Sequence, residues 1–202
     1  MTTAERYAEN ITLPRAIRFP VELIPPEGFD AERPETWPPV AGRLEFVDGR
    51  LLYIPPCGQL QQYTVSDVVI TLGAWVRAHR EFLLGTNEAG MRLQGSTRAA
   101  DAAVWRRGDV GQLRAGLLHV APVLAVEVGG DDEDEAALRR KAEWYLAVGV
   151  EVAWLVLPQS REVVVITRDG SRRYRDPEVL DPHPSLPDLQ PAVRDLFVQI
   201  TG

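Results

Sequence analysis

Two spacings of hydrophobic residues divide the chain into helices and strands. Apolar side chains recur every three or four residues in 60–84, 136–149 and 193–200, which predicts three helices. Continuous or alternating apolar runs predict strands at residues 44–47, 50–54, 88–93, 101–105, 122–128, 150–157, 162–168 and 171–174. This order of elements fits an α/β sandwich, in which helices flank a central mixed β-sheet.

Two Asp-Gly pairs mark tight turns between predicted strands. Asp48-Gly49 and Asp169-Gly170 each separate two apolar runs, so each predicts a β-hairpin, and we place the second hairpin at the edge of the sheet. In the first hairpin Glu45 alternates with its apolar neighbours and points to the opposite face of the strand. That face is either solvent or, in a sheet covered on both sides, the active cleft.

The first 40 residues differ from the rest of the chain. They contain seven prolines and little periodicity, which predicts an extended N-terminal arm, with a short helix near residues 4–10. The arm is too apolar to be simply disordered, so we expect it to pack on the domain or on a second subunit. Residues 41–202 contain no linker and are predicted to form a single domain.

Charge and composition narrow the functional classes. A net charge of -7 and a pI near 5.1 argue against broad non-specific nucleic-acid binding, although a local basic groove is compatible with them. A single cysteine, Cys57, excludes an internal disulfide and a Cys-rich zinc site. The chain has no apolar run near the ~18 residues of a membrane span and no signal-peptide pattern, so we expect a cytoplasmic location and no membrane partner.

The lysine content singles out one position. The chain has 22 Lys and Arg residues, and Lys141 is the only lysine among them. At about 100° per residue, Lys141 falls inside the apolar arc of its helix, whereas Arg139 and Arg140 fall on the opposite side. A buried ammonium needs a partner because an unpaired buried charge is very costly. The alternative is a lysine at the edge of the core that extends its ammonium to water.

Two carboxylates precede this lysine. Glu127 interrupts a continuous apolar strand that ends in Gly-Gly, and Asp101 opens a second apolar strand. A structural Glu127–Lys141 pair, and a turn role for Asp101, would explain these positions without function. In the functional interpretation, the two carboxylates hold Mg²⁺ and Lys141 orients the attacking water or helps to deprotonate it.

These motifs resemble those of a known family. The stretches Asp101-Ala-Ala-Val, Val-Leu-Ala-Val-Glu127-Val and Lys141-Ala-Glu-Trp-Tyr-Leu-Ala-Val-Gly-Val, in this order and spacing, resemble the Uma-two family of restriction endonuclease-like proteins, a branch of the PD-(D/E)xK nucleases. The hairpin Arg43-Leu-Glu-Phe-Val-Asp-Gly and the C-terminal Leu186-Pro-Asp-Leu are also similar to family motifs. The resemblance extends from about residue 41 to the end.

The resemblance implies a fold and a site. It implies a restriction endonuclease-like domain that cleaves DNA with Mg²⁺ or Mn²⁺, held by Asp101, Glu127 and the main-chain carbonyl of Val128. Lys141 would supply the cation, and Glu45 would hold a second metal or orient the first. A homodimer is expected, since cutting a duplex needs two active sites. The candidates for phosphate contacts are three arginines near the Asp101 strand, Arg92, Arg98 and Arg106.

Several departures from the family pattern leave an alternative open. Ala100 replaces the proline before Asp101, Gly129 stands where the wider superfamily has its lysine, and Gln61 or Gln62 replaces a common histidine. The acidic run 131–135 would repel a phosphate backbone, or it would simply stabilise a helix N-terminus. The alternative is therefore a catalytically degenerate nuclease fold that binds nucleic acid or protein. A nuclease for RNA is a third hypothesis.

Overall fold

The computed structural model describes residues 19–130 and 133–201, so the short helix predicted near residues 4–10 lies outside the described residues. Within these residues, nine strands form one mixed sheet. The strands are β1 (Val21–Leu23), β2 (Arg43–Val47), β3 (Arg50–Ile54), β4 (Phe82–Leu93), β5 (Ser96–Arg106), β6 (Leu124–Val128), β7 (Val152–Leu157), β8 (Glu162–Thr167) and β9 (Gly170–Arg175). Their order is β1-β3-β2-β5-β6-β7-β8-β9, and β4 also pairs with β5.

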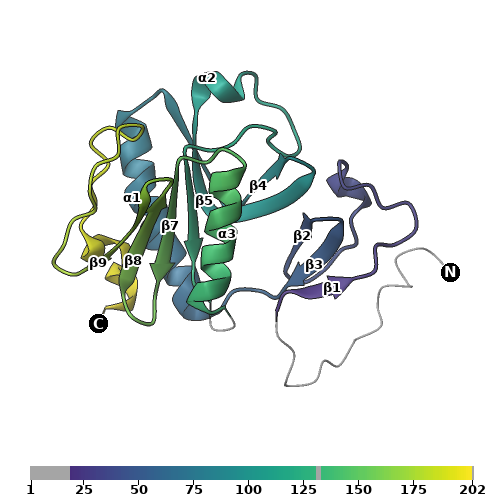
Figure 1. Ribbon diagram of the computed structural model, residues 1–202, viewed down its shortest axis with the longest axis horizontal. Helices are drawn as coiled ribbons and strands as arrows, with labels where there is room; N and C mark the ends of the chain where they lie inside the picture. Colours follow the sequence, from purple (N-terminus) through teal and green to yellow (C-terminus); the bar gives the residue numbers. More distant parts are fainter. Residues whose placement is uncertain (1–18, 131–132, 202) are drawn as a thin grey trace.

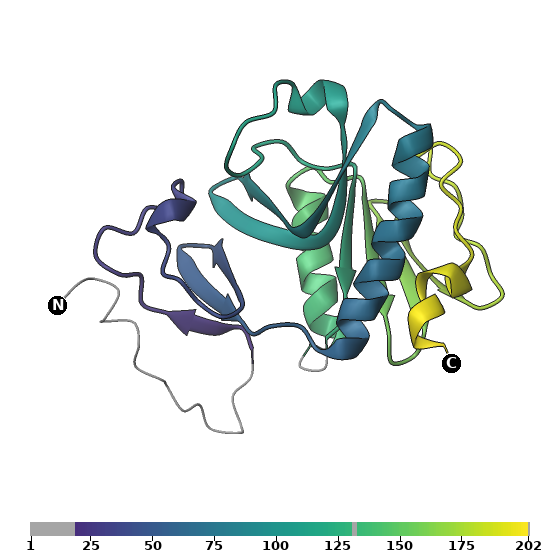
Figure 2. The same cartoon turned by 180° about the vertical axis from the view of Figure 1, so that it is seen from behind.

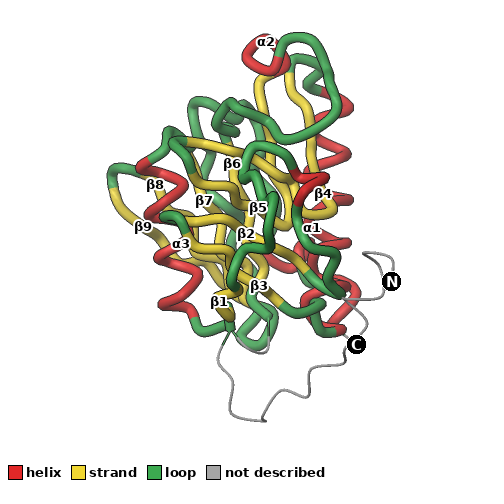
Figure 3. Tube along the Cα trace, turned by 90° about the vertical axis from the view of Figure 1, so that its right-hand side faces the viewer, coloured by secondary structure: helices red, strands yellow, loops and turns green. Residues whose placement is uncertain are grey.

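Two long helices cover opposite faces of the sheet. Helix α1 (Gln59–Ala78) lies on one face and helix α3 (Glu135–Ala147) on the other, which Figure 3 shows from the side. The remaining helical segments are short, and they are η2 (Pro34–Thr36), α2 (Arg107–Val110), η3 (Val193–Leu196) and η4 (Val198–Ile200). The prediction of an α/β sandwich around a mixed sheet is confirmed.

Strand β6 lies inside the sheet and is covered on both of its faces. All five of its residues are buried, and β6 pairs parallel with β7 and antiparallel with β5. Val126 and Val128 belong to the core beneath α1, whereas Ala125 belongs to the core on the α3 side. Because strand side chains alternate between faces, Glu127 must also point towards α3.

Strands β1 to β3 form a lobe beside the main body (Figures 1 and 2). The predicted hairpin is confirmed as β2 and β3, and β1 from the proline-rich segment adds to it through Val21↔Tyr53. The lobe joins the body where β2 pairs with β5, at Phe46↔Thr97. We call β1, β2 and β3 together the β1–β3 lobe.

Two helix predictions were wrong in their extent. The first helix ends at Ala78 instead of residue 84, and Leu83 and Leu84 pair with β5 as part of β4. The apolar pattern continues across this boundary because helix and strand bury side chains against the same core. The predicted C-terminal helix is two 3-10 turns, since Phe197 leaves the helical conformation at φ -137°. The second hairpin, β8 and β9, is confirmed at the sheet edge. Among the described residues, no helix has the length and apolar character needed to cross a membrane.

Candidate active site

The pairing of β5 with β6 brings the two predicted carboxylates to one place. Ala102 faces Val126 in the sheet, so Asp101 and Glu127 lie on neighbouring strands at the end of this short pairing. The main-chain N–H of Val128 donates a hydrogen bond to Asp101 Oδ2 at 2.7 Å. Asp101 is therefore anchored to the strand that carries Glu127.

Helix α3 supplies two donors to Glu127. Lys141 and Tyr145 lie four residues apart, one turn along the same face of the helix. The ammonium of Lys141 donates to Glu127 Oε2 at 3.1 Å, and the hydroxyl of Tyr145 donates to Oε1 at 2.6 Å. All three side chains are buried. Both oxygens of Glu127 are thus held by groups on one helix.

The structure explains the described part of the acidic run. Glu133 accepts a second hydrogen bond from Lys141, at 2.6 Å, so it belongs to the site. Asp134 caps α3 by accepting from the N–H of Ala137 at 2.7 Å, which agrees with the helix N-terminus interpretation. Glu135 pairs with Arg139 on the outer surface. Residues 131 and 132 lie outside the described part of the chain.

Strand β2 of the β1–β3 lobe and strand β5 together form a second group of charges. Arg98 donates to Glu45 Oε2 at 2.7 Å, and its guanidinium lies over the ring of Trp144 at 5.1 Å from the centroid. Arg43 lies between two acids, 3.9 Å from Glu45 and 3.5 Å from Asp101. Within this group, three buried atoms have no hydrogen-bond partner among the described residues, and they are Arg43 Nε, Arg98 Nε and Glu45 Oε1. This group therefore has unused hydrogen-bonding capacity.

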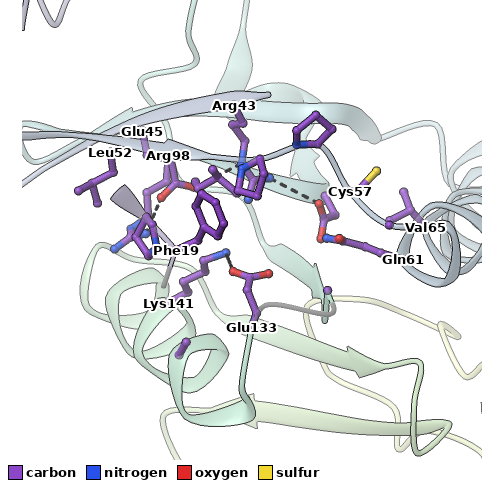
Figure 4. Close-up of a pocket in the computed structure, with 18 of the residues that line it drawn as sticks. Phe19, Arg43, Glu45, Leu52, Cys57, Gln61, Val65, Arg98, Glu133 and Lys141 are labelled. Carbon is purple, nitrogen blue, oxygen red and sulfur yellow. Dashed lines mark hydrogen bonds and ion pairs between the residues drawn. The ribbon is translucent and has the colours of Figure 1, made fainter. Parts of the chain in front are cut away.

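These charged residues line one cavity of about 690 Å³ between the lobe, the start of α1 and α3 (Figure 4). We call the following residues the cavity cluster: Arg43, Glu45, Arg98, Asp101, Glu127, Glu133, Lys141 and Tyr145. Most of them line the cavity directly, whereas Glu127, which accepts from Lys141, and Tyr145, which donates to Glu127, do not line it. The cluster joins four strands or loops to one helix.

Burial and proximity shift the pKa values of the site. Burial, and then the negative charge of Glu127, raise the pKa of Asp101 to about 6. Burial also disfavours the ionised form of Glu127, but Lys141 and Arg43 outweigh it and lower the pKa of that carboxyl. Burial likewise opposes the charge on Lys141, yet Glu127 leads a group of acids that raises its pKa. Lys141 and Glu127 are therefore charged at neutral pH, and Asp101 is the acid that resists ionisation.

The two carboxylates fit a divalent cation that keeps much of its water. The described residues contain no group of three or more His, Cys, Asp or Glu side chains placed to hold a metal. Mg²⁺ commonly binds through only one or two carboxylates, completed by water and substrate phosphate. Asp101 Oδ1 lies 3.5 Å from Arg43 Nη1, and a cation beside it would offset the burial and the repulsion from Glu127 that raise its pKa. The carbonyl of Val128 accepts from Gln61 Nε2 at 3.0 Å and retains a second lone pair.

The three arginines proposed for phosphate contacts lie in different places. Arg98 is in the cavity cluster. Arg92 pairs with Glu32 and Thr97, and Arg106 pairs with Glu151 at 2.7 Å. Neither Arg92 nor Arg106 lines the cavity.

Sequence reasoning missed three members of the cluster, Arg43, Glu133 and Tyr145, and one neighbour, Gln61. Arg43 is two residues before Glu45 and therefore shares its strand face, and Tyr145 is four residues after Lys141 on the same helix face. Both spacings could have identified Arg43 and Tyr145. Gln61 stands where the family has a histidine, and its side-chain amide donates a hydrogen bond to the Val128 carbonyl. An amide cannot transfer protons as a histidine can.

The structure combines a mixed sheet with a helix on each face, an Asp and a Glu on neighbouring strands, and a Lys on the covering helix, as expected for a restriction endonuclease-like protein. The sequence matches the Uma2 family, described as "Putative restriction endonuclease", over residues 31–199, so the chain belongs to this family. A crystal structure from Anabaena variabilis ATCC 29413, titled a "putative nuclease belonging to DUF820", has a similar fold. The TM-score is 0.71 at 19% identity, and the match covers 81% of this chain and 94% of that one. No curated protein matches the sequence.

Proposed function

We propose that the protein is an endonuclease that hydrolyses phosphodiester bonds of DNA with Mg²⁺ held by Asp101 and Glu127. The supporting observation is that these two acids and the only lysine of the chain lie in one buried cluster, with Lys141 3.1 Å from Glu127. Their chain positions are 40 residues apart, so the fold, and not local sequence, brings them together. Membership of a nuclease family supports the same reaction class.

The metal site would consist of Asp101, Glu127 and the Val128 carbonyl. When bound there, Mg²⁺ would polarise the phosphate and lower the pKa of a water molecule that attacks it. Mn²⁺ has the same preference for oxygen ligands and is expected to substitute. Asp101 is ready for this role because the Val128 N–H fixes one of its oxygens and leaves the other directed away from that bond.

Lys141 acts as a fixed positive charge. Because its pKa is raised by the surrounding acids, it remains protonated at neutral pH and cannot take a proton from water. Its ammonium can instead donate to the attacking water or to a phosphate oxygen as negative charge develops there. Of the two roles that we predicted for Lys141, we retain the orienting one.

The remaining cluster residues position these groups. Tyr145 holds Glu127 in one orientation through a 2.6 Å hydrogen bond. Arg43 balances the charges of Glu45 and Asp101, which keeps both acids in place before a metal arrives. Glu45 is paired with Arg98, so we assign it to orienting the arginines and not to a second metal.

The test is cleavage of a labelled DNA oligonucleotide by purified protein with Mg²⁺ and with EDTA. Glu127→Gln and Lys141→Ala are each expected to lower the Mg²⁺-dependent rate at least about 100-fold, because each removes charge stabilisation from the reacting phosphate. Arg139→Ala is the matched control, since Arg139 lies on the outer face of the same helix and pairs with Glu135. Circular dichroism would verify that each variant is folded. Full activity in either site variant contradicts the proposal.

One observation favours the second candidate, a nuclease fold that only binds nucleic acid or protein. Lys141 already contacts two carboxylates, Glu127 and Glu133, so less of its donor capacity is left for substrate. Glu133→Gln separates the candidates in the same cleavage test. In an active enzyme this change frees a donor and maintains or raises the rate, whereas in a non-catalytic protein every variant is equally inactive.

A further inference from the structure

The depth of the site limits which phosphates can reach it. The side chains of Glu45 and Glu127 are 2% exposed, and those of Asp101 and Lys141 are 11% exposed. A scissile phosphate must approach these groups closely, so it has to enter the cavity. The phosphates of a double helix lie on the outside of a stiff, wide rod and cannot descend between walls without distortion of the DNA.

Such walls stand on both sides of the cavity. The β1–β3 lobe forms one side, and the first turns of α1 together with α3 form the other. Leu52 and Val65 are examples from the two sides. At about 690 Å³, the cavity lies in the size range of small-molecule pockets, roughly 300–1,000 Å³, which suits one or two nucleotides.

The β1–β3 lobe and the residues that flank its strands give this cavity an apolar wall that a phosphate does not require. Its members are Phe19, Pro20, Val47, Leu52, Ile54, Pro55 and Pro56. The ring of Phe19 lies edge-on to Tyr53, with centroids 6.1 Å apart, and so rests on the lobe. Bases stack on aromatic and apolar surfaces of this kind, but the faces of paired bases are already covered by their neighbours in a duplex.

Two exposed arginines stand at the rim, on opposite walls. Arg50 is on the β2–β3 hairpin and Arg140 is on α3, and neither has an ion-pair partner in the part of the chain that the structure describes. The cavity arginines Arg43 and Arg98, in contrast, are engaged by acids. Two free cations can hold two phosphates on either side of the cavity, which is a short footprint on a protein of net charge -7.

From these features we infer that the cavity takes an unpaired nucleotide of single-stranded DNA, with its base against the apolar wall around Phe19 and its flanking phosphates on Arg50 and Arg140. This inference rests on the proposed function and narrows its substrate. A single strand is cut by one active site, so this substrate removes the reason to expect a homodimer.

Binding of two labelled probes tests the inference without the need for cleavage. One probe is a short single strand and the other is the same strand annealed to its complement, both measured by fluorescence anisotropy on the full chain with Ca²⁺. The single strand is expected to bind at least about ten-fold more tightly. Equal affinities, tighter binding of the duplex, or no binding of either probe overturns the inference.

Three substitutions locate the probe. Phe19→Ala is expected to weaken single-strand binding about five-fold or more, which corresponds to about 1 kcal/mol of base stacking, whereas Phe19→Trp maintains it. Arg50→Ala and Arg140→Ala should each make the slope of log K against log[salt] less steep by about 0.7, which is the contribution of one phosphate contact on a single strand. Arg77→Ala is the matched control, because Arg77 is also exposed but lies about 16 Å further along α1 than the last cavity residue of that helix, Ser66. An unchanged affinity and salt slope in the three site variants contradicts the inference.

Cleavage of the same two probes with Mg²⁺ separates this inference from the proposed function. If neither probe is cut although the single strand binds preferentially, the endonuclease proposal fails and the assignment of the cavity's ligand stands. If the duplex is cut as fast as the single strand, the endonuclease proposal stands and the inference fails.

Discussion

Helix α3 contributes to two clusters of charged residues that differ in burial and in how completely their charges are paired. Its inner face contributes Lys141 and Tyr145 to the cavity cluster, while its outer face contributes to a surface cluster on β8 and β9. The surface cluster consists of Glu135, Arg139, Glu162, Arg173 and Arg175. Both clusters contain short contacts between opposite charges, so contact distances alone do not distinguish them.

Burial and completeness distinguish the two clusters. In the surface cluster Glu162 is buried, with 11% of its side chain exposed, but Arg173, which donates hydrogen bonds to both Glu135 and Glu162, is 33% exposed. Its bond to Glu135, more than any other effect, lowers the pKa of that carboxyl, so the surface acids are stabilised as anions. In the cavity cluster, Glu45 is 2% exposed and has an oxygen without a hydrogen bond, and Asp101 has a raised pKa. Buried charge that is incompletely paired is costly, and such sites are typical of functional centres.

The largest expected effect is a loss of unfolding free energy when Arg43, the central arginine of the cavity cluster, is replaced. Arg43→Met removes the cation between Glu45 and Asp101, and breaking a buried ion pair in this way typically costs about 3–5 kcal/mol of unfolding free energy. Urea denaturation of the variant and the wild type at pH 8 measures the loss. A loss below about 1 kcal/mol, the range of a surface pair, would contradict the distinction drawn here.

Replacement of Asp101 is expected to raise the unfolding free energy, by less than the replacement of Arg43 lowers it. Its pKa is about 6 in the folded protein and near 4 in an unfolded chain, so the folded protein binds the proton more tightly. The ionised Asp101 carboxylate therefore lowers the unfolding free energy. This penalty is absent below about pH 4, grows as the pH rises, and is complete above about pH 6. In metal-free protein, Asp101→Asn should be more stable than wild type by up to about 3 kcal/mol at pH 8.

The pH dependence provides the control for Asp101→Asn. The advantage of the variant should disappear at about pH 3, below both pKa values, where the wild-type carboxyl is protonated in both the folded and the unfolded state. Urea titrations at the two pH values give the comparison. A variant that is less stable than wild type at pH 8 would indicate that Arg43 stabilises the ionised form of Asp101 more than burial and Glu127 oppose it.

The smallest effect is expected in the surface cluster. Arg173→Met removes a partner from Glu135 and Glu162, but Arg139 remains beside Glu135 and Arg175 beside Glu162, and water can solvate Glu135, whose side chain is 33% exposed. The unfolding free energy should fall by less than about 1 kcal/mol, and less again at high salt because exposed charges are screened. If this loss equals that of Arg43→Met, burial does not separate the two clusters.

The sequence was informative wherever a contact depends on local spacing. The Asp-Gly turns predicted both hairpins, and the position of Lys141 in the apolar arc predicted its inward direction and its contact with Glu127. Helix α3 is the next element after β6, and a short connection joins the two. This connection fixes which end of the strand and which face of the helix come together. Local periodicity is sufficient in such cases.

Contacts between distant segments could not be predicted in the same way. Arg43 reaches Asp101 because β2 pairs with β5 at one position, Phe46↔Thr97, and this register depends on packing of the whole lobe. The end of the first helix was missed for a related reason, since Leu83 and Leu84 are apolar in either conformation. Glu133 could not be assigned to the site because an acidic residue before a helix is also suited to its N-terminus.

The central claim is that Asp101 and Glu127 hold a divalent cation in the cavity cluster. Isothermal titration of the metal-free protein with Mn²⁺ tests it most directly, with Asp101→Asn as the site variant and Arg173→Met as the surface control. We expect one Mn²⁺ site on the wild type and on Arg173→Met, with an affinity lower by more than about ten-fold in Asp101→Asn. If the wild type binds no Mn²⁺ at millimolar concentrations, or if Asp101→Asn binds it as tightly as the wild type, these two carboxylates do not hold the cation.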